Sequence, residues 1–251
     1  MFKRFEREVQ ATTRLRSPHT IIVYDFGITA EGTFYYVMEL LDGIDVSTLV
    51  RGYGPQPAER VVHLMIQACH SLHEAHLNGL VHRDIKPGNL FTCRYGADVD
   101  FLKIHDFGLV KHLEPEPEQP ELTTEGMVTG TPTYMAPEMI VKDRTIDGRS
   151  DIYALGCVAY WLLTGELVFW DDTPMKVMVK HVKEFPEPPS MRSELEIPEA
   201  LDVLILECLE KDASKRPQTA RDLSDRLKAL NLHQKWTDER AREWWDSFFP
   251  K

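Results

Sequence analysis

Four polar side chains with complementary chemistry lie in two short segments of the chain. Asp84, Lys86 and Asn89 fall within residues 82–89, which read HRDIKPGN, and Asp106 begins the later triplet DFG. An aspartate can accept or orient the proton of an attacking hydroxyl, and a nearby lysine can neutralise charge on a phosphoryl group. An amide oxygen and a second carboxylate are ligands that Mg²⁺ prefers. The pattern therefore predicts metal-assisted phosphoryl transfer, with all four residues catalytic and with Asn89 and Asp106 as metal ligands.

The elements that must position these residues differ on the two sides of Asp42. Before it, a charged amphipathic helix leads into two β-rich runs, at 20–26 and 33–40. After it, apolar residues recur at helical spacing up to residue 230, and helices are expected to open at Pro57, Asp151, Pro174, Pro198 and Thr219. The sequence therefore predicts an α+β protein with a small sheet-bearing lobe at 1–41 and a mainly helical lobe at 42–230.

Composition and charge exclude several other classes of protein. The formal net charge is −11, and no dense Lys/Arg cluster offers a surface for nucleic acid or an anionic membrane. The apolar stretch 152–170 is interrupted by Gly156 and Glu166, which favours a buried helix over a transmembrane segment. The N-terminus does not read as a secretory signal. Four widely spaced cysteines without a Cys-x-x-Cys pair indicate reduced thiols and a cytoplasmic location: Cys69, Cys93, Cys157 and Cys208.

A third segment, residues 130–138 with the sequence GTPTYMAPE, completes a family resemblance. Together with the two catalytic segments, it makes the chain similar to bacterial eukaryotic-like (Hanks-type) serine/threonine protein kinases, from the helix that holds Glu8 to about Leu230. The spacing of Asp84 and Lys86 is that of the Ser/Thr class. The resemblance implies a protein-kinase-like fold that uses ATP and Mg²⁺ to phosphorylate serine and threonine residues of protein substrates.

The resemblance also implies roles for residues that support the peptide site. Thr131 would face the catalytic aspartate within the substrate-binding segment. Glu138, Asp151 and Arg216 match positions that are structural in the family, and Arg216 would pair with Glu138. We expect these last three residues to contribute to stability and not to catalysis.

By the same resemblance, residues 36–41 would form the last strand and hinge of the small lobe. Met38 is then the gatekeeper, and the main chain of Glu39 and Leu41 would hydrogen-bond the adenine edge. Phe91 would lie beneath the adenine ring. Taken without the resemblance, the run is simply a β-strand that passes from an edge into the core.

The segment after Asp106 corresponds to the activation loop of the family. Residues 114–121 are acidic and rich in proline, which predicts an extended loop. Arg83 stands where many related kinases hold a phosphorylated loop residue, and Thr123 and Thr124 are the candidates for that modification. The alternative is that the acidic loop itself holds Arg83.

The chain departs from the family pattern at its front. Glu8 corresponds to the helix glutamate that pairs with a strand lysine, yet neither a Gly-x-Gly-x-x-Gly loop nor a Val-Ala-x-Lys strand precedes it. We therefore expect an incomplete small lobe, with Met1 as a truncated or misassigned start. The alternatives are a non-catalytic kinase-like (pseudokinase) binding module and one half of a split kinase. The complete catalytic set favours the enzyme.

The last segment, residues 231–251, has aromatic residues at helical spacing behind a capped start at Thr237. The spaced residues are Ala241, Trp244, Trp245, Phe248 and Phe249. We expect an amphipathic helix that packs back onto the large lobe. The alternative is a helix that docks on a protein partner through its aromatic face.

Overall fold

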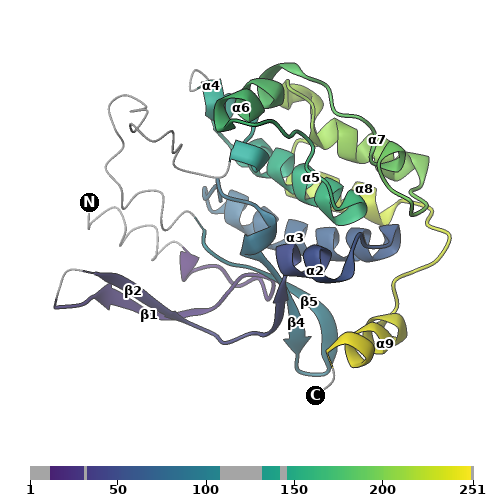
Figure 1. Cartoon of the computed structure of the whole chain (residues 1–251). Coiled ribbons are helices and arrows are strands. Elements are labelled where there is room, and N and C mark those ends of the chain that lie inside the picture. The colour runs from purple at the N-terminus through teal and green to yellow at the C-terminus, as the bar shows by residue number, and fades with distance from the viewer. Residues whose placement is uncertain (1–11, 31–32, 108–131, 142–145, 250–251) are drawn as a thin grey trace.

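The computed structural model describes residues 12–30, 33–107, 132–141 and 146–249. Within these ranges a two-stranded hairpin projects from one side of a larger body, which consists of a three-stranded sheet and a group of helices (Figure 1). This arrangement of small antiparallel sheets and a mostly helical lobe confirms the predicted α+β class.

The projecting hairpin is formed by β1 (Val23–Ile28) and β2 (Phe34–Met38), which pair antiparallel. The first strand begins later than the run predicted at 20–26, because residues 20 and 21 bind to the body instead. The Ile21 N–H donates to the Ile104 carbonyl at 2.9 Å, and Thr20 forms a parallel bridge with Ile104. The chain is therefore anchored to the large lobe just before the hairpin begins.

A second sheet, in the order β3-β4-β5, lies at the start of the large lobe. Its strands are β3 (Asp42–Asp45), β4 (Leu90–Tyr95) and β5 (Asp98–Ile104). Gly43 is needed here, because a Cβ at this position would lie 2.1 Å from the Thr92 carbonyl oxygen on the neighbouring strand. The sequence pattern did not predict this sheet. It matters for the site because Asn89 immediately precedes β4 and Asp106 follows β5.

The helical body surrounds two long helices, α3 (Ala58–Leu77) and α5 (Gly148–Thr164). The remaining helices are α2 (Val46–Tyr53), α4 (Pro137–Val141), α6 (Pro174–Lys183), α7 (Glu199–Cys208), α8 (Ala220–Lys228) and α9 (Asp238–Phe248). Single 3₁₀ turns occupy η1 (Pro87–Asn89), η2 (Pro132–Tyr134), η3 (Pro189–Met191) and η4 (Ala213–Lys215). The core is continuous from α2 and α3 through α5 to α7 and α8.

Helix α5 is buried along nearly its whole length, which explains its apolar sequence. It begins at Gly148, three residues earlier than predicted, because Asp147 caps it by accepting a hydrogen bond from the Arg149 N–H. Gly156 allows α7 to approach, since a Cβ there would lie 2.8 Å from the Cys208 Cβ. No helix in the described ranges is long and apolar enough to span a membrane, in agreement with the prediction of a buried core helix.

Threonine side chains cap three other helices at or beside the predicted starts. Thr173, Thr219 and Thr237 each accept a hydrogen bond from a main-chain N–H in the first turn of α6, α8 and α9. Such a cap stabilises a helix by about 1 kcal/mol. The four cysteines are free and buried, as their spacing predicted.

Helix α9 packs against the β4-β5 end of the large lobe (Figure 1). Trp245 is fully buried, and its indole N–H donates to Asp100 Oδ1 at 2.6 Å. Trp236, just before the helix, donates to Asp100 Oδ2 at 2.8 Å. Of the two alternatives for this segment, the structure thus shows the packed one.

Candidate functional site

The segment 82–89 is held in place by Asp151 from α5. The Asp151 side chain is only 1% exposed, and it accepts hydrogen bonds from the main-chain N–H groups of His82 and Arg83, both at 2.8 Å. Its Oδ2 also lies 2.8 Å from His76 Nε2. These bonds offset the cost of a left-handed backbone at Arg83, where φ is 64°. The turn at Arg83 places Asp84 beside the pocket described below.

His82 connects this segment to the residue before Asp106. Its Nδ1 accepts a hydrogen bond from the Asp84 N–H at 3.2 Å, so the ring hydrogen is on Nε2, which donates to the His105 carbonyl at 3.0 Å. His82 is fully buried, and this burial lowers its pKa despite the nearby carboxylates. A neutral imidazole therefore fixes the spacing between the two catalytic segments.

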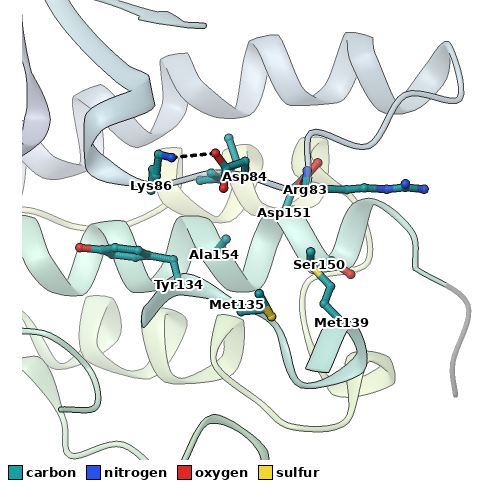
Figure 2. A pocket seen from close by; sticks show the side chains of 10 residues that line it. Arg83, Asp84, Lys86, Tyr134, Met135, Met139, Ser150, Asp151 and Ala154 are labelled. Atoms are coloured by element: carbon teal, nitrogen blue, oxygen red, sulfur yellow. Dashed lines mark hydrogen bonds and ion pairs between the residues drawn. The ribbon is translucent and has the colours of Figure 1, made fainter. Parts of the chain in front are cut away.

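The side chains of Asp84, Lys86 and Asn89 converge. Lys86 Nζ lies 2.8 Å from Asp84 Oδ2, and Asn89 Nδ2 donates to the Asp84 carbonyl at 2.8 Å and approaches Oδ2 at 3.2 Å. Figure 2 shows the Asp84–Lys86 pair on one side of the loop, with Arg83 extending in the opposite direction. The side chains of Asp84 and Lys86 are 20% and 32% exposed, so a substrate can reach them.

Asp106 lies next to this group. The His105 N–H donates to the Asn89 carbonyl at 3.1 Å, and the Asp106 backbone has a positive φ of 61°. Its Oδ1 accepts a hydrogen bond from the Tyr36 hydroxyl at 2.7 Å, and its Oδ2 lies 3.2 Å from His105 Nδ1. Burial acts to raise the pKa of Asp106, but these two neighbours outweigh it and hold the pKa below its usual range. Asp106 is therefore ionised at neutral pH.

A narrow pocket of about 10 Å³ separates the catalytic loop from the segment 132–141 (Figure 2). It is lined by Arg83, Asp84, Ile85, Lys86, Tyr134, Met135, Met139, Ser150, Asp151 and Ala154. One wall is thus charged and carries two of the predicted catalytic residues, whereas the other is aromatic and thioether-rich. The pocket has room for about one water molecule, so an acceptor peptide could lie over it but not inside it.

Glu138 and Arg216 fix the far side of this segment. Arg216 donates to both carboxylate oxygens of Glu138, at 2.7 and 2.8 Å, and Ser150 Oγ donates to Oε1 at 2.7 Å. Burial acts to raise the pKa of Glu138, but the bonds and charge of Arg216 outweigh it and leave the pKa below its usual range. This is the pair that the resemblance implies.

The residues expected to bind the adenine lie at the end of β2, in the segment 39–41 that follows it, and on β4. Met38 ends β2 and is 40% exposed, and Leu41 follows it half-buried. The Glu39 N–H donates to the Ile22 carbonyl at 3.0 Å, so only the Glu39 carbonyl would be offered to an adenine. Phe91 is half-buried on β4, opposite Asp45.

Four candidate residues fall outside the described ranges. These are Glu8, Thr123, Thr124 and Thr131. Conversely, Tyr36 contacts Asp106 but was not among the predicted site residues. Its sequence signal was only that of an aromatic residue in a β-rich run, which is typical of any strand.

The side-chain oxygens of Asn89 and Asp106 are suitable ligands for Mg²⁺. Asn89 directs its amide nitrogen at Asp84, which leaves its oxygen for a metal, and Asp106 contributes an ionised carboxylate. In the described part of the chain, no group of three or more His, Cys, Asp or Glu residues is suited to hold a metal. Two oxygen ligands are nevertheless typical of Mg²⁺ sites, because this ion keeps several waters and binds substrate phosphates.

Comparison with known proteins identifies the family of this chain. The family model described as Protein kinase domain matches residues 1–227. Serine/threonine-protein kinase pkn3 of Myxococcus xanthus is 36% identical over 240 residues, which cover 95% of this chain and 44% of that protein. The chain spans less than half the length of the curated relatives it matches.

Solved structures agree on the fold. The PknI kinase domain of Mycobacterium tuberculosis is 25% identical, with a TM-score of 0.68 over 90% of this chain and 78% of that chain. Rad53 in complex with AMP-PNP is 23% identical, with a TM-score of 0.74 over 90% of this chain and 54% of that chain. The match to the family model, the identity to a bacterial serine/threonine kinase and the shared fold show that this chain belongs to the protein kinase domain family.

Proposed function

We propose that this chain is the catalytic domain of a serine/threonine protein kinase that transfers the γ-phosphoryl group of ATP to hydroxyl groups of protein substrates. The observation that carries the proposal is the convergence of Lys86 and Asn89 on Asp84, with Asp106 linked to the same loop through His82 and His105. Each side chain has a separate task in phosphoryl transfer. The family membership supports the same reaction.

When bound, Mg-ATP would supply the γ-phosphoryl group, and its Mg²⁺ would neutralise negative charge on the phosphates. Asn89 and Asp106 would hold the metal through one neutral and one anionic oxygen. Asp84 would orient the substrate hydroxyl and accept its proton, and Lys86, 2.8 Å from Asp84, would place a cation beside the transferred group. For the adenine we propose Met38, Glu39, Leu41 and Phe91, as the family resemblance implies.

The peptide would bind beside the catalytic loop. Tyr134, Met135 and Met139 lie across a narrow gap from the segment that carries Asp84, and the proximity of these two segments supports an acceptor peptide that lies along their edge. Thr131, which immediately precedes the described segment, is proposed to face Asp84 at the same site.

Regulation by phosphorylation is a further part of the proposal. Arg83 is exposed, and its side chain extends away from Asp84 (Figure 2). A guanidinium in this position can pair with a phosphothreonine, and we propose Thr123 or Thr124 as the modified residue. Phosphopeptide mapping of active protein should find phosphate on one of them. Active protein with neither threonine modified would contradict this part of the proposal.

The phosphotransfer itself can be tested with γ-labelled ATP and a protein substrate rich in serine and threonine. Asp84→Asn should lower the transfer rate by about 10²- to 10⁴-fold, because the group that accepts the proton is lost. Asp98→Asn, which changes an exposed aspartate on β5, is the control and should keep the rate. Undiminished transfer by Asp84→Asn would remove Asp84 from its role. A wild-type chain that binds nucleotide without any transfer would support the pseudokinase alternative.

A further inference from the structure

Tyr36 reaches from the projecting hairpin to the candidate metal site. It lies on β2, and its hydroxyl donates to Asp106 Oδ1 at 2.7 Å across 70 positions of sequence. Its neighbour Tyr35 lies on the opposite face of the strand, as β geometry requires, and is 41% exposed. The two tyrosines therefore have the same chemistry and adjacent positions, but only Tyr36 contacts the site.

A second side-chain contact to the same part of the large lobe lies three residues further along. Glu39 Oε1 accepts a hydrogen bond from Lys103 Nζ at 2.6 Å, and the Lys103 side chain is fully buried. The partners of Tyr36 and Glu39 are thus Asp106, just after β5, and Lys103, within β5. The end of β2 is therefore tied to the segment that leads into Asp106 by two contacts that involve charged groups.

The Asp106 carboxylate has capacity for both a hydrogen bond and a metal. A carboxylate has about four acceptor positions on its two oxygens, and Tyr36 uses one of them on Oδ1. The side chain is 28% exposed, so a cation can approach the remaining positions. The contact to Tyr36 restricts rotation of the carboxylate without blocking it, and a ligand that is already oriented binds more tightly.

We infer that Tyr36 is a positioning residue for the metal, because its hydroxyl holds the Asp106 carboxylate in the orientation that binds Mg²⁺. The inference rests on the proposed function, in which Asp106 is a metal ligand. Tyr36 contacts neither substrate nor metal itself. The hydrogen bond from Tyr36 makes the metal site depend on the β1-β2 hairpin, so that metal binding and attachment of the hairpin strengthen each other.

The test compares Mn²⁺ binding by four proteins: the wild type, Tyr36→Phe, Tyr35→Phe and Asp106→Asn. Free Mn²⁺ is measured by electron paramagnetic resonance in the presence of ADP. Tyr36→Phe should bind Mn²⁺ about tenfold more weakly, the effect of one hydrogen bond to a charged group. Tyr35→Phe should bind like the wild type, and Asp106→Asn should show no specific binding.

The outcomes separate the inference from the proposed function. Wild-type affinity in Tyr36→Phe, with binding lost in Asp106→Asn, would overturn the inference and leave the metal assignment intact. Tighter binding by Tyr36→Phe would also overturn the inference, because the hydroxyl would then compete with the metal. Binding by Asp106→Asn that equals the wild type, or no binding by the wild type, would overturn the metal assignment and the inference together.

A second measurement needs no variant and covers the case in which Tyr36→Phe does not fold. Hydrogen exchange of the wild-type chain is followed with and without Mn²⁺ and ADP. The reciprocal coupling predicts slower exchange of the β2 amides when the metal is bound. Unchanged exchange in β2 would contradict the inference.

Discussion

Asp100 and Asp84 are both paired with a cation, yet their surroundings differ. Asp100 is completely buried, and its two oxygens accept hydrogen bonds from Arg60 at 2.6 and 2.8 Å and from the indoles of Trp236 and Trp245. Asp84 is 20% exposed and shares its pocket with Lys86. A carboxylate enclosed by donors can only hold the fold together, whereas one at an open pocket can exchange partners with a substrate.

The same contrast separates Glu138 from Asp106. Glu138 is 4% exposed and is bound by both arms of Arg216 and by Ser150. Asp106 is 28% exposed and retains acceptor capacity. In both pairs of carboxylates, exposure and the number of donors separate the residue with a structural role from the one proposed to be catalytic, although all four residues are acidic and hydrogen-bonded.

The largest effect on stability is expected for Asp100→Asn. The change leaves the buried guanidinium of Arg60 without its counter-charge, and breaking a buried pair costs about 3–5 kcal/mol. Asparagine tolerates the positive φ of 53° at this position, so the effect reports the lost charge. Urea unfolding measures it, with Asp98→Asn as the exposed control. A loss below about 1 kcal/mol would show that Asp100 does not organise this region.

Glu138→Gln should cost somewhat less, about 2–3 kcal/mol, because the amide keeps some hydrogen bonds to Arg216. The change should also alter the pH dependence of stability. Since the folded pKa of Glu138 lies below its usual range, its contribution is complete above the unfolded pKa of about 4.3 and is lost as the pH falls through the folded value. Unfolding free energies between about pH 6 and 2 should thus fall less steeply in the variant.

The exposed Glu194 provides the control for this prediction. Glu194→Gln should change neither the stability at neutral pH nor its slope in acid. Equal acid slopes in Glu138→Gln and the wild type would contradict the assignment of the buried pair.

Trp245→Phe should cost about 1–2 kcal/mol, because Asp100 loses one indole donor while most of the buried ring remains. Phe248→Leu is the control, since Phe248 is on the same helix and 51% exposed. Thermal unfolding measures both changes.

Deleting residues 232–251 should lower the melting temperature far more than Trp245→Phe does. If the deletion left stability unchanged and abolished association with another protein, docking and not packing would be the role of α9.

Lys86→Met should have the smallest effect on stability, within about 0.5 kcal/mol, because the side chain is 32% exposed. Its effect on catalysis should be large, about 10²-fold, because the cation beside the transferred phosphoryl group is lost. The exposed Lys215 supplies the control, Lys215→Met. A large loss of stability without a loss of phosphotransfer would place Lys86 with the structural residues.

Much of this arrangement could be predicted from local sequence. The helix starts at Thr219 and Thr237 were recognisable because a capping side chain acts within one turn. The convergence of Asp84, Lys86 and Asn89 was predictable because these three residues fall within six positions of one another, and the chemistry proposed for them depends on this short spacing.

The sheet formed by β3, β4 and β5 was not predictable in the same way. Its inward positions include the polar residues Thr92, Asp100 and Lys103, all completely buried, so the strands lack the apolar alternation that marks a half-buried strand. Asp100 and Lys103 are tolerated only because distant residues bind them, and Thr92 donates in turn to Asp100. Arg60 is 40 positions from Asp100, and Glu39 is 64 positions from Lys103. Tyr36 was missed for the same reason.

The distinction between the two kinds of carboxylate is tested most directly by measuring Asp84→Asn and Asp100→Asn side by side. For each variant, the free energy of unfolding in urea and the rate of phosphotransfer at a temperature where both are folded are determined. We expect Asp84→Asn to lose phosphotransfer with nearly unchanged stability, and Asp100→Asn to lose about 3–5 kcal/mol of stability while its folded fraction still transfers phosphate. An Asp84→Asn variant that is destabilised yet active would contradict the account.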